Sequence, residues 1–316
     1  MRNRLFSGSK FNLDIKVSEN PTLDIDYIVN TSTRPNIGWH VGSRIHFYPG
    51  LTYVNGKKGD LFDLRHMNVE ANVFSTFFNR FLISTGVGLE RYVRSEEFFD
   101  PTKNSLRLDQ AFAQFRFLRD TYNREHFPTA GASFEVRGKY AVGRKLKLVA
   151  TDSISSINDD NAMVRLQATK AFSFWKKVTP VLGFEAGYTR RAENNYLQRF
   201  YLGRSLANEW SHVEMAGLRY MELPVSSYIA GQFKLQIEPA TEFFTSLLFN
   251  YVDYTLETLR VDEGVVTNEV ITERDNLYGV GIELGMLTRL GPAAFTTEYN
   301  VNGKRFNFSL HIGHTF

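Results

Sequence analysis

Residues Phe306–Phe316, at the carboxyl end of the chain, read FNFSLHIGHTF. Large residues alternate there with small or polar ones, and a period of two residues is the pattern of an amphipathic β-strand. Chain termini are usually loose and polar, but this alternation continues to the last residue. We therefore predict a final strand with one face made of Phe306, Phe308, Leu310, Ile312, His314 and Phe316.

The same alternation recurs along the chain and predicts about fourteen strands, with no sustained helical period. The intervening segments are rich in Gly, Pro, Asn and Asp, which favour turns and loops. The predicted strands are Lys10–Val17, Leu23–Val29, Ile37–Phe47, Leu64–Phe74, Phe81–Tyr92, Ala111–Phe117, Ala132–Val142, Ala162–Phe172, Val181–Thr189, Ile229–Glu238, Glu242–Tyr251, Tyr278–Met286, Ala294–Tyr299 and Phe306–Phe316.

Composition narrows the class of protein. The 316 residues include no cysteine, so disulfides and Cys-based zinc sites are excluded. The net charge of +3 is too small to indicate nucleic-acid binding. Aromatic residues make up 14%, with 27 Phe and 15 Tyr, and these residues suit strands and membrane interfaces.

Two architectures place one apolar and one polar face on every strand. A soluble β-sandwich buries the apolar face, whereas a transmembrane β-barrel turns it toward lipid. No apolar run reaches the roughly 18 residues of a transmembrane helix, but a barrel needs only about 9–11 residues per strand. Tight connections (Ile237–Thr241, Leu290–Ala293) alternate with long ones (Gly50–Phe62, Tyr92–Leu108, Glu257–Asn276), as in outer-membrane barrels. The sequence therefore favours an all-β, antiparallel transmembrane β-barrel.

Two motifs resemble those of the outer membrane protein 85 superfamily, which comprises outer-membrane barrels that bear POTRA domains. The carboxyl end resembles a barrel-assembly signal, carried here by Phe308, Leu310, Ile312, His314 and Phe316. A strand ending in Asp120 is followed by Asn123 and by Phe127-Pro128-Thr129-Ala130-Gly131, which is similar to the family's D…N…F-P-T-x-G hairpin. In this hairpin the motif residues are Asp120, Phe127, Pro128, Thr129 and Gly131.

A long segment, residues 193–225, resembles the loop that folds into the lumen in this superfamily. Its Tyr201-Leu202-Gly203 and Ala216-Gly217-Leu218-Arg219 occupy the places of two family loop motifs. The family's loop arginine aligns with Ala216, and its acidic partner on the barrel wall aligns with Asn250. Both members of that pair are therefore neutral here, which weakens the expectation of a charged lock.

The resemblance implies a domain spanning residues 1–316 that corresponds to strands 3–16 of a sixteen-stranded barrel. We accordingly expect the chain to be incomplete at its amino end. A signal peptide, POTRA domains, two strands and a patatin-like lipolytic domain are then expected upstream of Met1. Inward-facing glycines such as Gly279, Gly281 and Gly285 are expected to make room for the inserted loop.

Catalytic chemistry is not indicated within this chain. The nearest approach to a G-x-S-x-G nucleophile elbow, Gly203–Ala207, lacks the final glycine. His311 and His314 face opposite sides of a strand, so they cannot share a metal, and no cofactor motif is present. The lumenal charges, among them Glu185, Lys234 and Glu283, are interpreted as a solvated wall. A cluster of arginines is expected to brace the loop in preference to binding lipopolysaccharide: Arg190, Arg191, Arg199 and Arg204.

The sequence thus predicts no enzyme, but an anchor and conduit in the outer membrane of a Gram-negative bacterium. The passenger implied by the resemblance is patatin-like. An insertase or translocase of the same superfamily and a porin-like channel remain alternatives. Expected partners are outer-membrane lipids and lipopolysaccharide, the barrel-assembly machinery and a second copy of the chain in a homodimer, but no nucleic acid.

Overall fold

The computed structural model describes most of the chain. The described residues are 2–3, 9–16, 21–33, 36–54, 57–78, 80–95, 106–124, 126–148, 153–156, 160–175, 177–190, 199–203, 211–218, 222–262, 265–288 and 291–312. These residues form strands and turns, and no helix among them is long and apolar enough to cross a membrane. The all-β class predicted from the alternation is confirmed.

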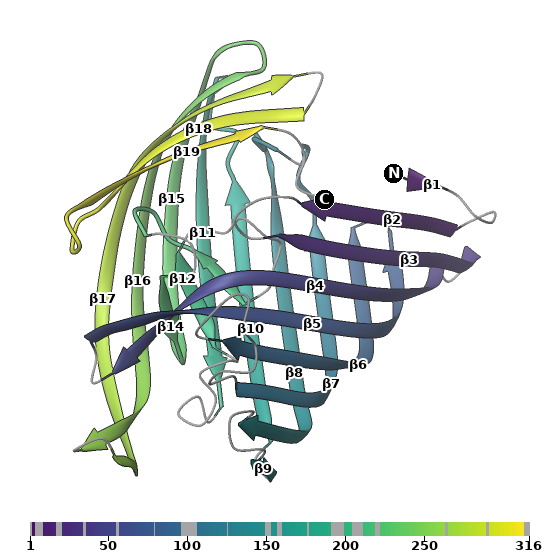
Figure 1. Ribbon diagram of the computed structural model, residues 1–316. Coiled ribbons are helices and arrows are strands. Elements are labelled where there is room, and N and C mark those ends of the chain that lie inside the picture. The colour runs from purple at the N-terminus through teal and green to yellow at the C-terminus, as the bar shows by residue number, and fades with distance from the viewer. Residues whose placement is uncertain are drawn as a thin grey trace. The chain divides into compact units, whose positions relative to one another are not determined.

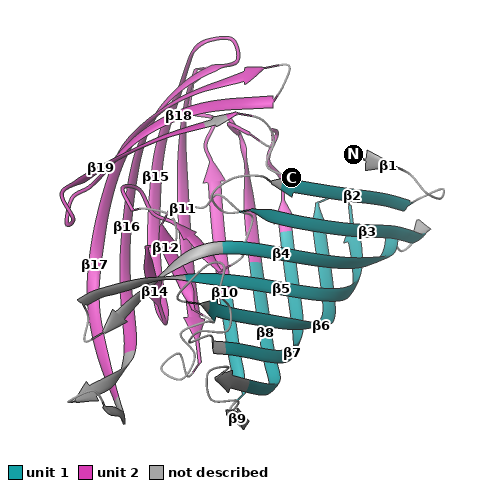
Figure 2. Cartoon of the chain, viewed as in Figure 1, with its two compact units in different colours: residues 1–118, 136–164 teal, residues 119–135, 165–316 magenta. Residues whose placement is uncertain are grey.

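The chain divides into two compact units, drawn in teal and magenta in Figure 2. Unit 1 comprises residues 1–118 and 136–164, and unit 2 comprises residues 119–135 and 165–316. Strands β7 (Leu106–Asp120), β8 (Gly131–Leu148) and β10 (Asn161–Ala171) contribute residues to both.

In unit 1, strands that follow one another in the chain pair as antiparallel neighbours from β1 to β6 (Figure 1). A short ninth strand, β9 (Ser153–Ser156), pairs with the end of β8. The remaining strands of the unit are β1 (Arg2–Asn3), β2 (Ser9–Lys16), β3 (Thr22–Thr33), β4 (Asn36–Val54), β5 (Lys57–Phe77) and β6 (Phe81–Ser95).

Unit 2 contains a second antiparallel series and a small separate sheet. The series runs in the order β11-β15-β16-β17-β18-β19. Its strands are β11 (Val178–Thr189), β15 (Ser227–Ala240), β16 (Phe243–Asp262), β17 (Val265–Thr288), β18 (Gly291–Asn300) and β19 (Arg305–Ile312). The small sheet, in the order β13-β12-β14, is built from β12 (Phe200–Gly203), β13 (His212–Glu214) and β14 (Leu223–Val225).

Each predicted strand corresponds to one of the strands β2–β8, β10, β11 and β15–β19. Two of the expected long loops were wrong. Residues 50–54 and 57–62 belong to β4 and β5, and residues 257–262 and 265–276 belong to β16 and β17; these strands are 19, 21, 20 and 24 residues long. Charged and glycine residues in both segments led to the expectation of loops, but pairing with the neighbouring strand keeps them extended.

The alternation gives the strands of the antiparallel series in unit 2 an apolar face and a polar face. On β11 and β15 the cross-strand partners Leu182 and Phe233 lie on the apolar face and are 49% and 41% exposed. Their neighbours Gly183 and Gln232 lie on the polar face. Large exposed apolar side chains continue this face on the later strands: Leu247, Phe249, Val280, Ile282, Leu284, Phe295, Phe308, Leu310 and Ile312.

Candidate functional site

The described part of the inserted segment, residues 199–203, 211–218 and 222–225, packs as a small β-structure with its own buried residues. The backbone amide of Tyr201 donates to the Ser211 carbonyl, and Met215 donates to Gly203, which joins β12 to β13. Phe200, Leu202 and Val225 are fully buried. Because burial of each such side chain contributes about 1.5–3 kcal/mol, this core holds the segment together.

The contact that fixes the segment to the wall uses backbone atoms. The Gly217 amide donates a hydrogen bond to Glu298 Oε2 at 3.1 Å, and Glu298 is 6% exposed. Gly217 has a φ of +79°, and a Cβ added there would come within 2.2 Å of the Asn300 amide nitrogen. Glycine is thus required both by the left-handed backbone and by the close approach to β18.

Ala216 lies against another glycine on the polar face. A Cβ added to Gly279 would come within 2.5 Å of the Ala216 carbonyl oxygen. Gly279 is paired with Asn250 on β16 and with Asn300 on β18. The structure therefore brings Ala216 and Asn250, the two positions aligned with the family's charged pair, to one patch of wall.

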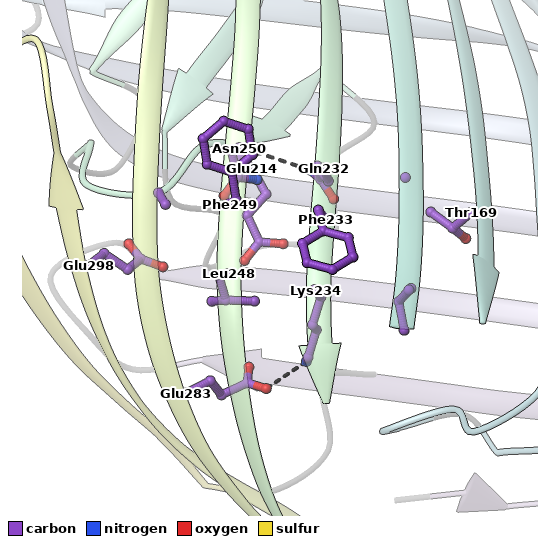
Figure 3. A pocket seen from close by; sticks show the side chains of 13 residues that line it. Thr169, Glu214, Gln232, Phe233, Lys234, Leu248, Phe249, Asn250, Glu283 and Glu298 are labelled. Atoms are coloured by element: carbon purple, nitrogen blue, oxygen red, sulfur yellow. Dashed lines mark hydrogen bonds and ion pairs between the residues drawn. The ribbon is translucent and has the colours of Figure 1, made fainter. Parts of the chain in front are cut away.

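A cavity of about 150 Å³ lies beside this contact (Figure 3). Glu283 accepts from Lys234 Nζ at 2.5 Å and from the Ser246 hydroxyl at 3.3 Å. The Gln232 side chain reaches the Glu214 carbonyl oxygen at 3.4 Å. Thirteen residues line the cavity: Thr169, Val181, Gly183, Glu214, Ala216, Gln232, Phe233, Lys234, Leu248, Phe249, Asn250, Glu283 and Glu298.

This cavity predicts the effect of placing an arginine at position 216. In Ala216→Arg the guanidinium would enter a space lined by Glu283 and Glu298, and hydrogen bonds to charged groups contribute about 1.5–3 kcal/mol. We expect Ala216→Arg to be more stable to urea than Ala216→Leu by about that amount. The leucine variant controls for added volume without charge. Equal midpoints for the two variants would contradict the assignment of the cavity.

The opposite end of the segment is held by an ion pair. Arg305 Nη1 lies 2.6 Å from Glu222 Oε1, joining the residue before β14 to the start of β19. At the start of β12, the Phe200 ring packs edge-on against the Tyr228 ring, with the ring centroids 5.1 Å apart. Tyr228 donates its hydroxyl hydrogen bond to Glu185, which also accepts from Arg165 at 2.9 Å. The polar face thus contacts the segment through Glu298, Gln232, Arg305 and Tyr228.

The predicted hairpin motif forms the turn between β7 and β8. Asp120 accepts from the Tyr122 amide at 2.8 Å, and the Thr121 amide donates to the Ala132 carbonyl. Asn123 Oδ1 accepts from the amides of Thr129 and Ala130, both at 3.1 Å. Pro128 lies within this turn, and Gly131, the first residue of β8, has a φ of +105°.

Phe127 turns its ring from this hairpin onto the polar face. It is 7% exposed and stacks on Phe244 with ring centroids 4.5 Å apart. A Cβ added to Gly285 would come within 2.3 Å of the Phe127 ring. Lys234 Nζ lies 5.3 Å from the centroid of the same ring, which connects the hairpin to the cavity wall.

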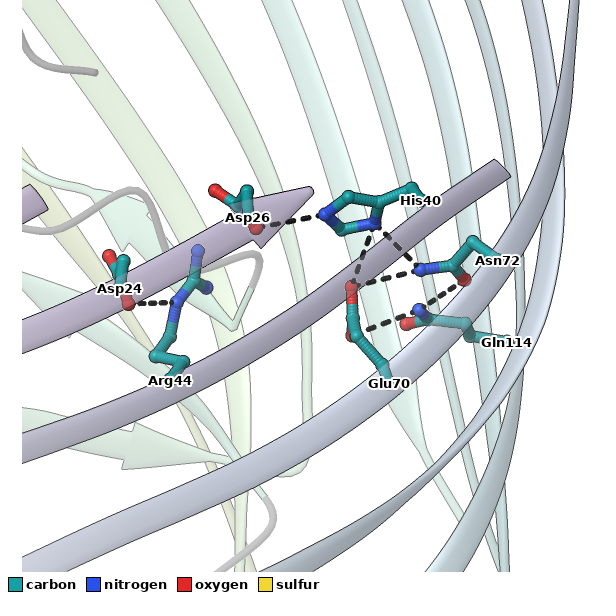
Figure 4. A network of polar contacts seen from close by, with 7 residues as sticks. All are labelled: Asp24, Asp26, His40, Arg44, Glu70, Asn72 and Gln114. Atoms are coloured by element: carbon teal, nitrogen blue, oxygen red, sulfur yellow. Dashed lines mark hydrogen bonds and ion pairs between the residues drawn. The ribbon is translucent and has the colours of Figure 1, made fainter. Parts of the chain in front are cut away.

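In unit 1 the polar face carries networks of paired charges. His40 Nε2 lies 2.8 Å from Asp26, and Glu70 accepts from Gln114 at 3.0 Å (Figure 4). Asn72 links the two by contacting both His40 and Glu70. A second network centres on the buried Glu90, which contacts Lys139, His66, Tyr92 and Gln110. In both networks, acidic side chains lie beside basic side chains that can neutralise their charge.

Other predicted site residues are placed less informatively. Phe308, Leu310 and Ile312 lie on the apolar face of β19, each more than 60% exposed. Tyr201, Leu202 and Gly203 form the buried strand β12 and Leu218 is buried. Among the arginines, Arg199 is buried and Arg190 is exposed. Arg191, Arg204, Arg219, His314 and Phe316 lie outside the described residues.

Sequence reasoning missed Glu298. Glu298 lies on the short strand β18, and its place in the alternation, on the polar face, was the only sign in the sequence that marked it. Asn123, at the Asn of the family's hairpin pattern, lies three residues after Asp120, the last residue of β7, where Asn commonly bonds to nearby backbone. No described group of three or more His, Asp and Glu side chains could hold a metal ion.

Comparison with known proteins gives a consistent result. The sequence model of the OMP85 superfamily matches residues 1–316. BamA from Haemophilus ducreyi lacking POTRA domains 1–3 superposes with a TM-score of 0.67 at 11% identity, covering 96% of this chain and 64% of that chain. CdiB from Acinetobacter baumannii gives 0.56 at 12% identity, with 96% and 53% covered. No curated protein sequence matches. This chain spans less than two thirds of the length of either solved structure. The match to the family and to these two structures confirms the predicted barrel fold.

Proposed function

Because the chain belongs to the OMP85 superfamily of outer-membrane β-barrels, we propose that it anchors an N-terminal passenger and serves as its conduit, with the inserted segment as plug. The contact between the Gly217 amide and Glu298 carries this proposal. It holds the segment against the polar face without any charged group on the segment. Since a barrel turns its polar face to the lumen, a segment seated there occupies the path of transport.

Single-channel recording tests the plug. We expect the wild-type protein, in planar bilayers, to give small and flickering openings. Glu298→Ala leaves the buried Gly217 amide without its acceptor, at a cost of about 1–3 kcal/mol. Openings in which the inserted segment leaves the polar face should therefore become about 5- to 150-fold more frequent. Glu273→Ala, at an exposed position of β17, is the matched control and should behave as wild type.

Two other outcomes would replace this proposal with an alternative. Large, stable wild-type pores would indicate a porin-like channel. Faster folding of an unrelated barrel protein in vesicles that contain this protein would indicate an insertase or translocase. An anchor and conduit should produce neither result.

The finer identity of the passenger rests on the loop resemblance alone. We propose a patatin-like lipolytic domain, because the loop motif has Ala216 where the superfamily's insertases are expected to carry arginine. Sequencing the DNA upstream of the Met1 codon tests this. A frame that encodes POTRA domains and a G-x-S-x-G hydrolase is the expected result, and POTRA domains without a hydrolase would contradict it.

A further inference from the structure

The turn between β10 and β11 combines exposed aromatic side chains with uncompensated positive charge. Phe174 and Trp175 are 67% and 66% exposed and meet edge-on with centroids 4.9 Å apart. The sequence Lys170–Thr179, KAFSFWKKVT, contains three lysines and no acidic residue. Large exposed aromatics are costly in water but favourable at a membrane interface, where lysines meet lipid phosphates.

The two described lysines of this turn have no acidic partner. Lys170 Nζ lies 4.7 Å from the centroid of the Phe172 ring, and Lys177 Nζ donates to the Pro239 carbonyl at 3.2 Å. No carboxylate in the described part of the chain forms an ion pair with either ammonium group. Each ammonium has three N–H donors, so both retain capacity for a phosphate oxygen.

The position of the turn along the strands indicates where it meets the bilayer. Outward side chains of β11 run from Pro180 through Leu182 and Phe184 to Tyr188. This run has the length that a tilted strand needs to cross the hydrocarbon layer, about 9–11 residues. Trp175, which forms a β-bridge with Val178, lies immediately beyond the Pro180 end of this row. The apolar row therefore gives way to aromatic and basic residues at head-group depth.

We propose that the β10–β11 turn is a binding surface for the head groups of anionic phospholipids. The aromatic pair enters the interface, and the two described lysines, Lys170 and Lys177, bind the phosphates. The turn lies at the end of unit 2 with short connections, which in outer-membrane barrels faces the periplasm. This surface is independent of the plug and of the passenger.

The first test measures depth. The chain has no cysteine, so Ser173→Cys carries a single fluorophore in this turn, and Thr272→Cys on the exposed part of β17 is the control. In vesicles of phosphatidylcholine and phosphatidylglycerol, we expect head-group-labelled lipid to quench the Ser173 label several-fold more than the Thr272 label. Quenching of the Ser173 label only by aqueous iodide would overturn the proposal and leave a protein partner as the occupant.

The second test measures charge dependence. Adding phosphatidylglycerol to phosphatidylcholine vesicles should slow unfolding of the wild-type protein on the order of tenfold or more. The double variant Lys170→Gln, Lys177→Gln should lose this response. Lys304→Gln, in the turn between β18 and β19, should retain it. The same response in the double variant and wild type would overturn the proposal, whatever the basal stability of the variant.

Discussion

Gly217→Val is expected to release the inserted segment from the wall while the strands remain folded. The substituted residue would meet the backbone of Tyr299 and Asn300, with a Cβ 2.2 Å from the Asn300 nitrogen. It would also have to keep a φ of +79°, which costs a β-branched residue about 1–3 kcal/mol before the steric overlap is added. Because backbone cannot yield as a flexible side chain does, we expect the segment to leave its seat.

Limited proteolysis of the folded protein measures this release. Cleavage within residues 193–225 should become at least tenfold faster in the variant. Gly231→Val is the matched control, since a Cβ at Gly231 would meet nothing within 4 Å. A Gly217→Val protein that is as resistant to protease as the control would show that the segment is not held at this point.

Phe127→Ala is expected to have the largest effect on the stability of unit 2. The ring is buried, stacked on Phe244 and fitted against Gly285. Truncation of a buried Phe usually costs about 3–5 kcal/mol, because the cavity left behind closes only in part. The urea concentration at which half of the protein is unfolded should therefore be well below the wild-type value in Phe127→Ala.

Phe134→Ala provides the comparison for this variant. Phe134 belongs to the same unit but lies on the apolar face and is 36% exposed. Its truncation opens no enclosed cavity, so a smaller loss is expected. If the two variants lose equal stability, Phe127 contributes only apolar area and the fit against Gly285 is unimportant.

The strands were predictable because alternation is a strong local signal. On β17, Tyr278, Val280, Ile282, Leu284 and Met286 mark the apolar face in the sequence and lie on it in the structure. The ends of β4, β5, β16 and β17 were not predictable in the same way. Charged and glycine residues interrupt those segments, so composition indicated loops, whereas pairing with one neighbouring strand keeps them extended.

The site was predictable only in part, because its decisive contact joins a backbone amide to a carboxylate far along the chain. Alignment of the loop motif located Ala216 and Asn250, and the structure places both beside one cavity. It could not identify Glu298, which is 81 residues from Gly217 and becomes its partner only through the register of β17 with β18. A main-chain donor leaves no residue type in the sequence to mark it.

That same main-chain donor changes what mutation can do at this site. A lock made of two charged side chains is lost when either one is replaced, so both positions must be kept together. Here the donor is present in every residue except proline, and the requirement falls on the shape of the chain at Gly217 and on one carboxylate, Glu298. At this contact the residue types of the neighbouring loop positions are therefore less constrained than in a charged lock, whereas the attachments through Glu222 and Phe200 still depend on their side chains.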